Sequence, residues 1–222
     1  MDKKITVPGE VSFVAGLLLI SFAISLMVIA GFGISTISSL PYVLSCIFNQ
    51  ISFGIWNPIF QICLLCLLLA ITKRFKSGYV ISVVLSVLFG LIINFFMHAV
   101  AGLPTEYWQR LLYFIAGYLF MCVAIALMVG SKIPLMIIDT FLNDLTIHFH
   151  VTYRRIKTLF DIICVVLSVI LSMVFLGHLE GVGIGTVIMA CITGLGVHVV
   201  NTTLSKVIII KPWSRWLGER VK

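Results

Sequence analysis

Long apolar runs separated by short polar or turn-forming segments fill the chain between residues 11 and 210. An α-helix needs about 20 apolar residues to cross a hydrocarbon core about 30 Å thick. The runs therefore predict six transmembrane helices, at residues 11–38, 55–72, 79–101, 110–129, 156–175 and 182–210. The first and the last of these are long enough to be tilted or broken.

The segments between the apolar runs carry proline, glycine or charge, and lie at residues 41–54, 73–78, 102–106, 130–157 and 177–181. Composition agrees with this pattern, because 61% of the 222 residues are hydrophobic and only 10% are charged. Soluble domains are about 45–50% apolar and about 25% charged. The sequence therefore excludes a soluble globular protein and predicts an all-α polytopic membrane protein.

The positions of the charges add an orientation. The chain has 15 Lys and Arg residues and a formal net charge of +7. If the N-terminus is cytoplasmic, 14 of these 15 lie on or near the inner side and only Arg110 lies outside. Because positive charge concentrates on the cytoplasmic side of membrane proteins, both termini are predicted to be cytoplasmic. The net charge then needs no nucleic acid as a partner. Residues 211–222 mix Trp with Arg and predict a short cytoplasmic interfacial helix.

The two halves of the chain share a pattern of matched positions. Three segments match at offsets that grow from 93 to 100 and 104 residues: 38–41 with 131–134, 59–62 with 159–162, and 90–94 with 194–198. The matches predict two three-helix units, at residues 1–104 and 105–210. Since three is an odd number of crossings, the second unit enters the membrane from the opposite side. We therefore predict a 3+3 inverted-topology repeat, an architecture that places transporter sites near the bilayer midplane.

Each half carries a Ser-x-x-Pro element, formed by Ser38 with Pro41 and by Ser131 with Pro134. Proline ends or breaks a helix and is well suited to begin a new one. After the second element, residues 134–144 predict an amphipathic helix that includes Asp139. Two interpretations stay open for it. It is either a surface helix on the inner leaflet, or a half-helix that dips toward the midplane with its N-terminal amides facing a ligand.

Ionisable residues within transmembrane helices are costly and therefore indicate function. Asp161 is the strongest candidate, and its alternative interpretation is a surface ion pair with Lys157 at i,i+4 spacing. Asn94 and His198 are polar residues at matching positions of the two halves. A lone histidine among apolar residues is more often hydrogen-bonded to a backbone carbonyl or a serine than used as a proton relay.

Gly183, Gly185 and Thr186 open the sixth predicted helix in a run that has some likeness to a phosphate loop. No strand precedes this run, so its context argues against nucleotide binding. Small residues here permit close helix packing or a cavity lined by backbone. The candidate substrate-binding residues are therefore Ser38, Pro41, Asn94, Ser131, Pro134, Asp139, Asp161, Gly183, Gly185, Thr186 and His198.

Catalytic motifs are missing from the sequence. It contains neither Gly-x-Ser-x-Gly nor His-Glu-x-x-His, and no pair of acidic residues at a shared depth of the predicted helices. We therefore expect a protein that is not an enzyme and that uses no metal and no cofactor. An intramembrane lipid-modifying enzyme stays open as an alternative.

Several features occur together in the second half. Arg110 opens a helix, Pro134 is followed by Asp139, an Arg-rich entry precedes Asp161, and residues 183–186 with Gly194 lie in the last predicted helix. This combination resembles the YczE/YyaS/YitT family of small bacterial integral membrane proteins over most of residues 14–205. The first half departs from the family pattern near Pro41 and at Asn94. The resemblance implies a protein of the bacterial cytoplasmic membrane with a role in transport and no defined substrate.

The predicted repeat and its polar residues favour a small secondary transporter or exporter of a small metabolite. We expect the lipid bilayer and a small-molecule substrate as partners, and self-association into a homodimer stays open. One alternative is the substrate-binding membrane subunit of an energy-coupling, vitamin-type transporter, which would copurify with an ATPase. The other is a regulatory membrane protein without transport, which would have no central polar cavity.

Overall fold

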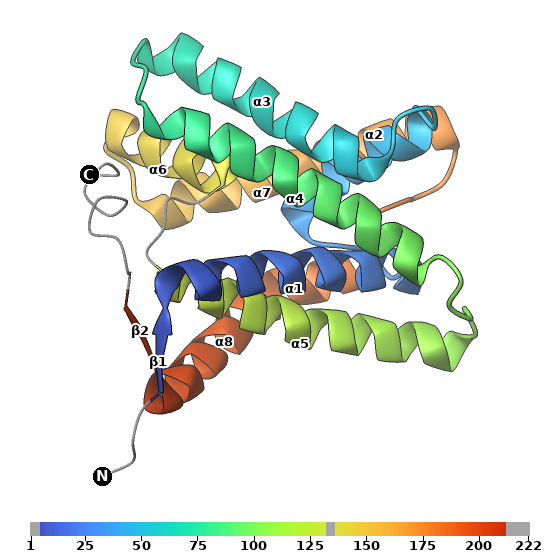
Figure 1. Ribbon diagram of the computed structural model, residues 1–222. Helices are drawn as coiled ribbons and strands as arrows, with labels where there is room; N and C mark the ends of the chain where they lie inside the picture. Colours follow the sequence, from blue (N-terminus) through green and yellow to red (C-terminus); the bar gives the residue numbers. More distant parts are fainter. Residues whose placement is uncertain (1–4, 132–135, 212–222) are drawn as a thin grey trace.

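The computed structural model describes residues 5–131 and 136–211. This part of the chain is almost entirely helical (Figure 1). Its elements are β1 (Ile5–Pro8), α1 (Gly9–Ala30), α2 (Thr36–Ile47), α3 (Phe53–Thr72), α4 (Gly78–Val100), α5 (Tyr107–Ser131), α6 (Ile137–Phe149), α7 (Tyr153–Leu171), the π-helical turn η1 (Ser172–Leu176), α8 (Ile184–Val207) and β2 (Ile208–Lys211).

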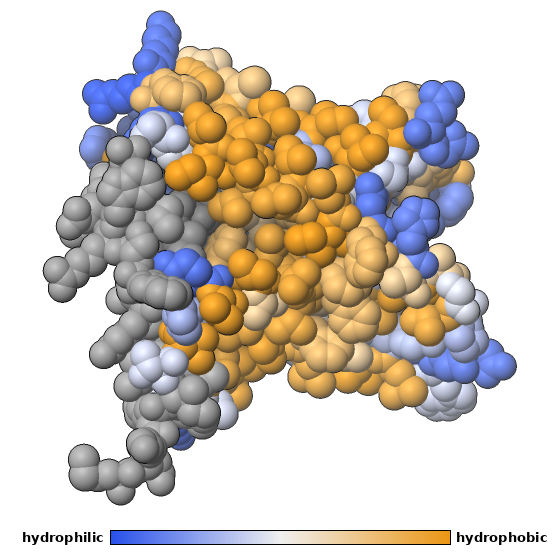
Figure 2. All heavy atoms as spheres, viewed as in Figure 1, coloured by the Kyte–Doolittle hydropathy of each residue, from blue (hydrophilic) through white to orange (hydrophobic). Residues whose placement is uncertain are grey.

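Six of the described helices are long and apolar enough to cross a membrane: α1, α3, α4, α5, α7 continued by η1, and α8. In Figure 2 hydrophobic residues form a broad band, and hydrophilic residues gather at the two ends of the helices. Many large apolar side chains within this band are exposed, as expected where lipid tails rather than water surround the protein. The predicted class, an all-helical multi-pass membrane protein, agrees with these features.

The two ends of the helical bundle differ. At one end β1 and β2 pair in parallel, with Ile5 opposite Ile208, so the two ends of the described chain lie together (Figure 1). We call this the β end, and it also holds the connection 73–77 between α3 and α4. The far end holds the connections 48–52, 101–106 and 177–183.

The central packing is between α1 and α5, which lie side by side over most of their length. Glycines permit this close approach. A Cβ on Gly16 would collide with Met128, and one on Gly117 would lie 3.0 Å from the Ala23 carbonyl oxygen. Around this pair, α4 packs on α1 and α8 packs on α5. Of the two short helices, α2 packs against α7 and α3, and α6 packs against α3, α7 and α4.

The first predicted helix, residues 11–38, is two helices instead of one. α1 ends at Ala30 because Gly31 adopts a left-handed conformation with φ of 67°, and Gly33 follows with φ of 106°. α2 begins only at Thr36. The expectation that Pro41 ends a helix is wrong, since Pro41 lies inside α2. Hydropathy could not separate the two helices because the residues between them are also largely apolar.

The helix predicted over residues 134–144 is present as α6, which begins at Ile137. Its polar residues have different surroundings, because Asp144 is buried against the protein while Asn143 is exposed. The last predicted helix ends at Val207, and residues 208–211 form β2. Of the interfacial helix predicted at residues 211–222, Lys211 belongs to β2, and residues 212–222 lie outside the described residues.

Candidate functional site

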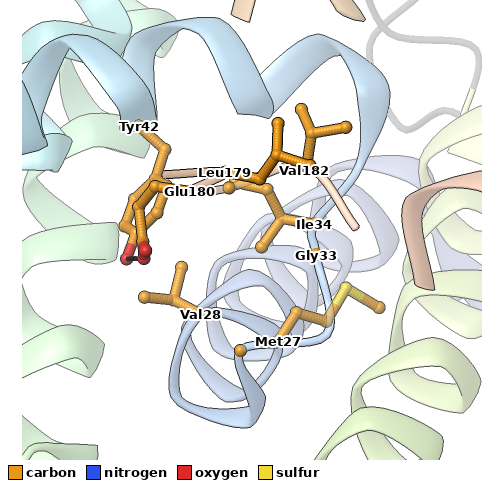
Figure 3. A pocket seen from close by; sticks show the side chains of 10 residues that line it. Met27, Val28, Gly33, Ile34, Tyr42, Leu179, Glu180 and Val182 are labelled. Carbon is orange, nitrogen blue, oxygen red and sulfur yellow. Dashed lines mark hydrogen bonds between the residues drawn. The ribbon is translucent and has the colours of Figure 1, made fainter. Parts of the chain in front are cut away.

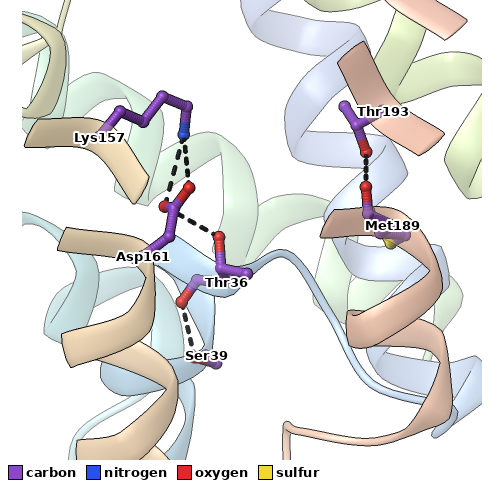
Figure 4. A network of polar contacts seen from close by, with 6 residues as sticks. All are labelled: Thr36, Ser39, Lys157, Asp161, Met189 and Thr193. Carbon is purple, nitrogen blue, oxygen red and sulfur yellow. Dashed lines mark hydrogen bonds and ion pairs between the residues drawn. The ribbon is translucent and has the colours of Figure 1, made fainter. Parts of the chain in front are cut away.

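The short helix α2 begins deep beside α7. Thr36 is its first residue, and its Oγ1 donates a hydrogen bond of 3.0 Å to Asp161 Oδ1 (Figure 4). Asp161 lies eight residues after the start of α7 at Tyr153, or about 12 Å along the helix axis. α2 therefore starts well inside the length of a helix that could cross the membrane.

From this point α2 runs beside α7 toward the far end. Ser39 Oγ lies 3.0 Å from Ser168 Oγ, seven residues beyond Asp161. Tyr42 Oη then donates a hydrogen bond of 3.1 Å to Glu180 in the connection after α7. The contact between the two helices is thus a line of polar side chains.

An ion pair lies at the start of this line. Lys157 Nζ is 3.0 Å from Asp161 Oδ2 and 3.4 Å from Oδ1. The two side chains are 40% and 24% exposed, so the pair is only partly shielded. The predicted i,i+4 ion pair is therefore present, but it is not a simple surface pair, because Thr36 from a distant segment binds the same carboxylate.

A second carboxylate, Asp139, lies in the first turn of α6, outside the six candidate spans, and interacts electrostatically with the same lysine. Burial raises the pKa of the Asp139 carboxyl to about 6, although the charge of Lys157 acts in the opposite direction. Tyr153 interacts electrostatically with both Asp139 and Asp161. Thr36 at the start of α2 and Asp139 in the first turn of α6 therefore both interact with the Lys157–Asp161 pair of α7.

The face of α7 that meets α2 continues as a stripe of small polar residues. Cys164, Ser168 and Ser172 follow Asp161 at helical spacing and are 2%, 0% and 0% exposed. The Ser168 hydroxyl donates to the Cys164 carbonyl oxygen, and the Ser172 hydroxyl donates to the His178 carbonyl oxygen. These hydrogen bonds let the two serine side chains lie buried at low cost.

At the far end the stripe reaches a small cavity of about 40 Å³ (Figure 3). Tyr42 and Glu180 supply its polar side chains, while Met27, Val28, Ile34, Leu179 and Val182 supply apolar ones. Ser172 Oγ accepts a hydrogen bond of 2.7 Å from the Glu180 backbone N–H and so holds that residue in place. This serine begins the π-helical turn η1, a local structure that is common at functional sites.

Gly183, Gly185 and Thr186 bind the segment that connects α1 with α2. The Gly185 N–H donates to the Phe32 carbonyl oxygen at 2.8 Å, and Thr186 Oγ1 donates to the Ile34 carbonyl oxygen at 2.8 Å. A Cβ on Gly183 would lie 2.5 Å from the Phe32 carbonyl oxygen. These residues therefore set where α2 begins.

Asn94 and His198 lie away from the Lys157–Asp161 pair. Asn94 Oδ1 accepts a hydrogen bond of 3.0 Å from the Gly54 backbone N–H, and so caps the start of α3. His198 is exposed on α8. Their matching sequence positions therefore do not correspond to matching contacts.

The remaining candidates belong to the two Ser-x-x-Pro elements. Ser38 and Pro41 are buried within α2. Ser131 is buried at the end of α5, where its hydroxyl donates to the Met128 carbonyl oxygen at 2.6 Å. Pro134 lies outside the described residues.

Sequence reasoning brought Asp139, Asp161 and Lys157 into consideration but missed Thr36, Tyr42 and Glu180. Gly31, Gly33 and Ser35 were the available signal, because turn-forming residues within an apolar run indicate a break. The described residues hold no group of three or more His, Cys, Asp or Glu side chains placed to bind a metal ion.

Comparison with curated proteins and with solved structures gives no match. A family model does match, over residues 8–202, which is most of the chain and includes every candidate residue named above. Its description is a family of unknown function, DUF6198. The chain belongs to this family.

Proposed function

We propose that this protein is a small secondary transporter or exporter of a small metabolite, with its substrate site where α2 begins beside Asp161 and Lys157. The observation that carries the proposal is the Thr36–Asp161 hydrogen bond, since it places the start of a half-length helix inside the length of a membrane-crossing one. Transporters commonly bind substrate with such broken helices, because the free amides at a helix start face the ligand.

A 3+3 inverted repeat is part of the proposal. Three kinds of helix contact occur in both of the forms that the repeat would relate, namely α1 with α4 and α5 with α8, α2 with α3 and α6 with α7, and α2 with α7 and α3 with α6. The packing of α3 on α4 departs from this pattern, because among the described residues α7 has no comparably extensive contact with α8. In this arrangement α1 and α5 lie on the pseudo-two-fold axis. α2 and α6 become half-helices that enter from opposite sides.

The proposed location is the bacterial cytoplasmic membrane, with both termini in the cytoplasm. The β end would then face the cytoplasm, in agreement with Lys73, Arg74 and Lys76 in the connection at that end. The resemblance to the YczE/YyaS/YitT family supports the same location.

The site chemistry favours a charged or strongly polar metabolite. A ligand that enters between α2 and α7 has to replace the contacts among Thr36, Lys157 and Asp161. Separating a partly buried ion pair without new partners is costly, so the ligand has to offer polar groups of its own. An apolar molecule could not compensate for these contacts.

The experiment compares cells that produce the wild-type protein, the variant Asp161→Asn or no added protein, with mass spectrometry of metabolites inside and outside the cells. We expect wild type to shift the distribution of at least one polar metabolite, and Asp161→Asn to lose that shift. Proteoliposome counterflow with the identified metabolite then tests transport directly.

Thr203→Val is the matched control, because Thr203 is exposed on α8 and its hydroxyl binds only its own helix at Val199. It should behave as wild type. The same metabolite distribution in cells with and without the protein would contradict transport. A shift that persists in a folded Asp161→Asn variant would place the site elsewhere.

A further inference from the structure

Each short helix is tied at its outer part to the other half of the chain by a tyrosine–carboxylate hydrogen bond. We propose that these two contacts are a pair of locks that close the site at Asp161 from the two ends of the bundle, and that they open in turn. The far-end lock is Tyr42 with Glu180, and the β-end lock is Asp144 with Tyr79 and Lys76. This inference rests on the proposed transport function.

The far-end lock closes α2 onto the connection between α7 and α8. Tyr42 Oη donates to Glu180 Oε1 at 3.1 Å, and both side chains line the far-end cavity, as Figure 3 shows. The Glu180 side chain is 35% exposed. Below this contact the line of polar side chains leads through Ser39 and Ser168 to Asp161. Breaking the contact would join the cavity to that line.

The β-end lock closes α6 onto the start of α4. Asp144 is 7% exposed and accepts two hydrogen bonds, one of 2.6 Å from Tyr79 Oη and one of 2.7 Å from Lys76 Nζ. Tyr79 is itself buried against α6 residues such as Ile137 and Phe141. Since α6 also packs on α7, which carries Lys157 and Asp161, movement of α6 away from Tyr79 would open the ion pair to the β end.

The two locks occupy corresponding places in the proposed repeat. Each joins the short helix of one half to the segment just before, or at the start of, the last helix of the other half. Lys76 and Glu180 are 104 residues apart, the same offset as Gly90 and Gly194. Contacts that close the site from opposite ends fit alternating access through an inverted repeat.

The two locks differ in strength. The β-end carboxylate is buried and has two donors, one of them an ammonium group. The far-end carboxylate is 35% exposed, lies beside a cavity, and has the Tyr42 hydroxyl at 3.1 Å and the His178 ring at the longer distance of 3.5 Å. Charge-assisted, shielded contacts are the stronger ones. The far end should therefore open more readily.

Cys164 provides the readout, because it is 2% exposed and lies one turn beyond Asp161 on the α7 face that meets α2. The experiment uses the full chain with Ala at the other five cysteines, in sealed membrane vesicles, and a membrane-impermeant maleimide added from one side or the other. Cysteines introduced by Gln50→Cys and Arg74→Cys, in separate variants, identify which side carries each end.

We expect Tyr42→Phe and Glu180→Ala each to raise the rate of Cys164 labelling from the far end about tenfold, since each removes the hydrogen bond between Tyr42 and Glu180. Tyr79→Phe and Asp144→Ala should raise the rate from the β end only. With both locks unmodified, Cys164 should be labelled slowly from either side, and faster from the far end than from the β end.

Tyr118→Phe and Glu106→Ala are the matched controls. Tyr118 donates to the Ile192 carbonyl oxygen on α8, and Glu106 is exposed in a far-end connection, so neither touches α2 or α6. Both should label as the unmodified background does. Each lock is tested with two different substitutions, which separates opening from misfolding. If the lock has opened, both of its variants should increase Cys164 labelling, and only from the end of that lock.

Equal labelling from both sides in the lock variants, or no change in all four of them, would overturn the lock inference. The metabolite experiment is independent of this result, since it compares wild type with Asp161→Asn. If metabolites do not shift but labelling responds from opposite sides, the locks are real and the transport proposal is wrong.

Discussion

Arg110 caps the end of α1 through a hydrogen bond of 2.7 Å from its Nε to the Ala30 carbonyl oxygen. Its guanidinium carbon also lies 5.4 Å from the centre of the Phe32 ring. A cation at a helix C-terminus offsets the helix dipole, and stacking on an aromatic ring adds to the attraction. Arg110 thus fixes both α1 and the segment that leads to α2.

We therefore predict that Arg110→Ala lowers the melting temperature of the purified protein by about 3–6 °C, as expected for the loss of one charged hydrogen bond. The melting temperature of Arg110→Lys should lie between those of wild type and Arg110→Ala, since lysine keeps the charge but loses the planar group. Differential scanning fluorimetry measures the change. Arg74→Ala removes an exposed arginine and is the control. Equal melting temperatures for both alanine variants would contradict the role of Arg110.

Gly90 and Gly194 occupy matching positions of the two halves but have opposite surroundings. A Cβ on Gly90 would collide with the Gly54 carbonyl oxygen, whereas one on Gly194 would meet no heavy atom within 4 Å. We predict that Gly90→Ala lowers the melting temperature by several degrees, since forced repacking costs about 1–3 kcal/mol. Gly194→Ala should leave it unchanged or slightly higher. A similar response of both variants would show that α3 and α4 are not in close contact.

The membrane-crossing helices could be predicted from the sequence, whereas long-range contacts between them could not. Long apolar runs predict the membrane-crossing helices because burial in lipid depends on length and composition alone. The length of the first run allowed a break, but its position after Ala30 was missed because the segment around Gly31 and Gly33 is also largely apolar, and the left-handed conformation of Gly31 ends the helix. Asp161 was found because a carboxylate in an apolar run is unusual. Its partner Thr36 was not, since no local pattern connects residues 125 positions apart.

Asn94 is expected to stabilise the fold without contacting the substrate. Its side chain accepts the hydrogen bond from Gly54, so Asn94→Ala should leave that amide unpaired and lower the melting temperature by a few degrees. Asn94→Asp keeps an acceptor for the Gly54 amide but adds a carboxylate within a membrane-crossing helix, so we do not expect it to restore wild-type stability. In cells that produce either variant, the metabolite distribution should equal that of cells with the wild-type protein. A loss of transport at unchanged melting temperature would instead return Asn94 to the site.

Asp139 predicts a pH dependence with a definite sign. Its pKa is raised to about 6 by burial, so the folded state holds the proton more tightly than the unfolded state does. The stability due to this proton is complete below the unfolded pKa of about 4, and it is lost as the pH rises through about 6. The melting temperature of wild type relative to Asp139→Asn should therefore fall by a few degrees between about pH 4.5 and about pH 7.5. Glu106→Gln replaces an exposed carboxylate, so its melting temperature should change with pH as that of wild type does. A constant difference between wild type and Asp139→Asn would mean that Asp139 does not titrate in this range, and a rise would mean that its pKa is lowered by Lys157.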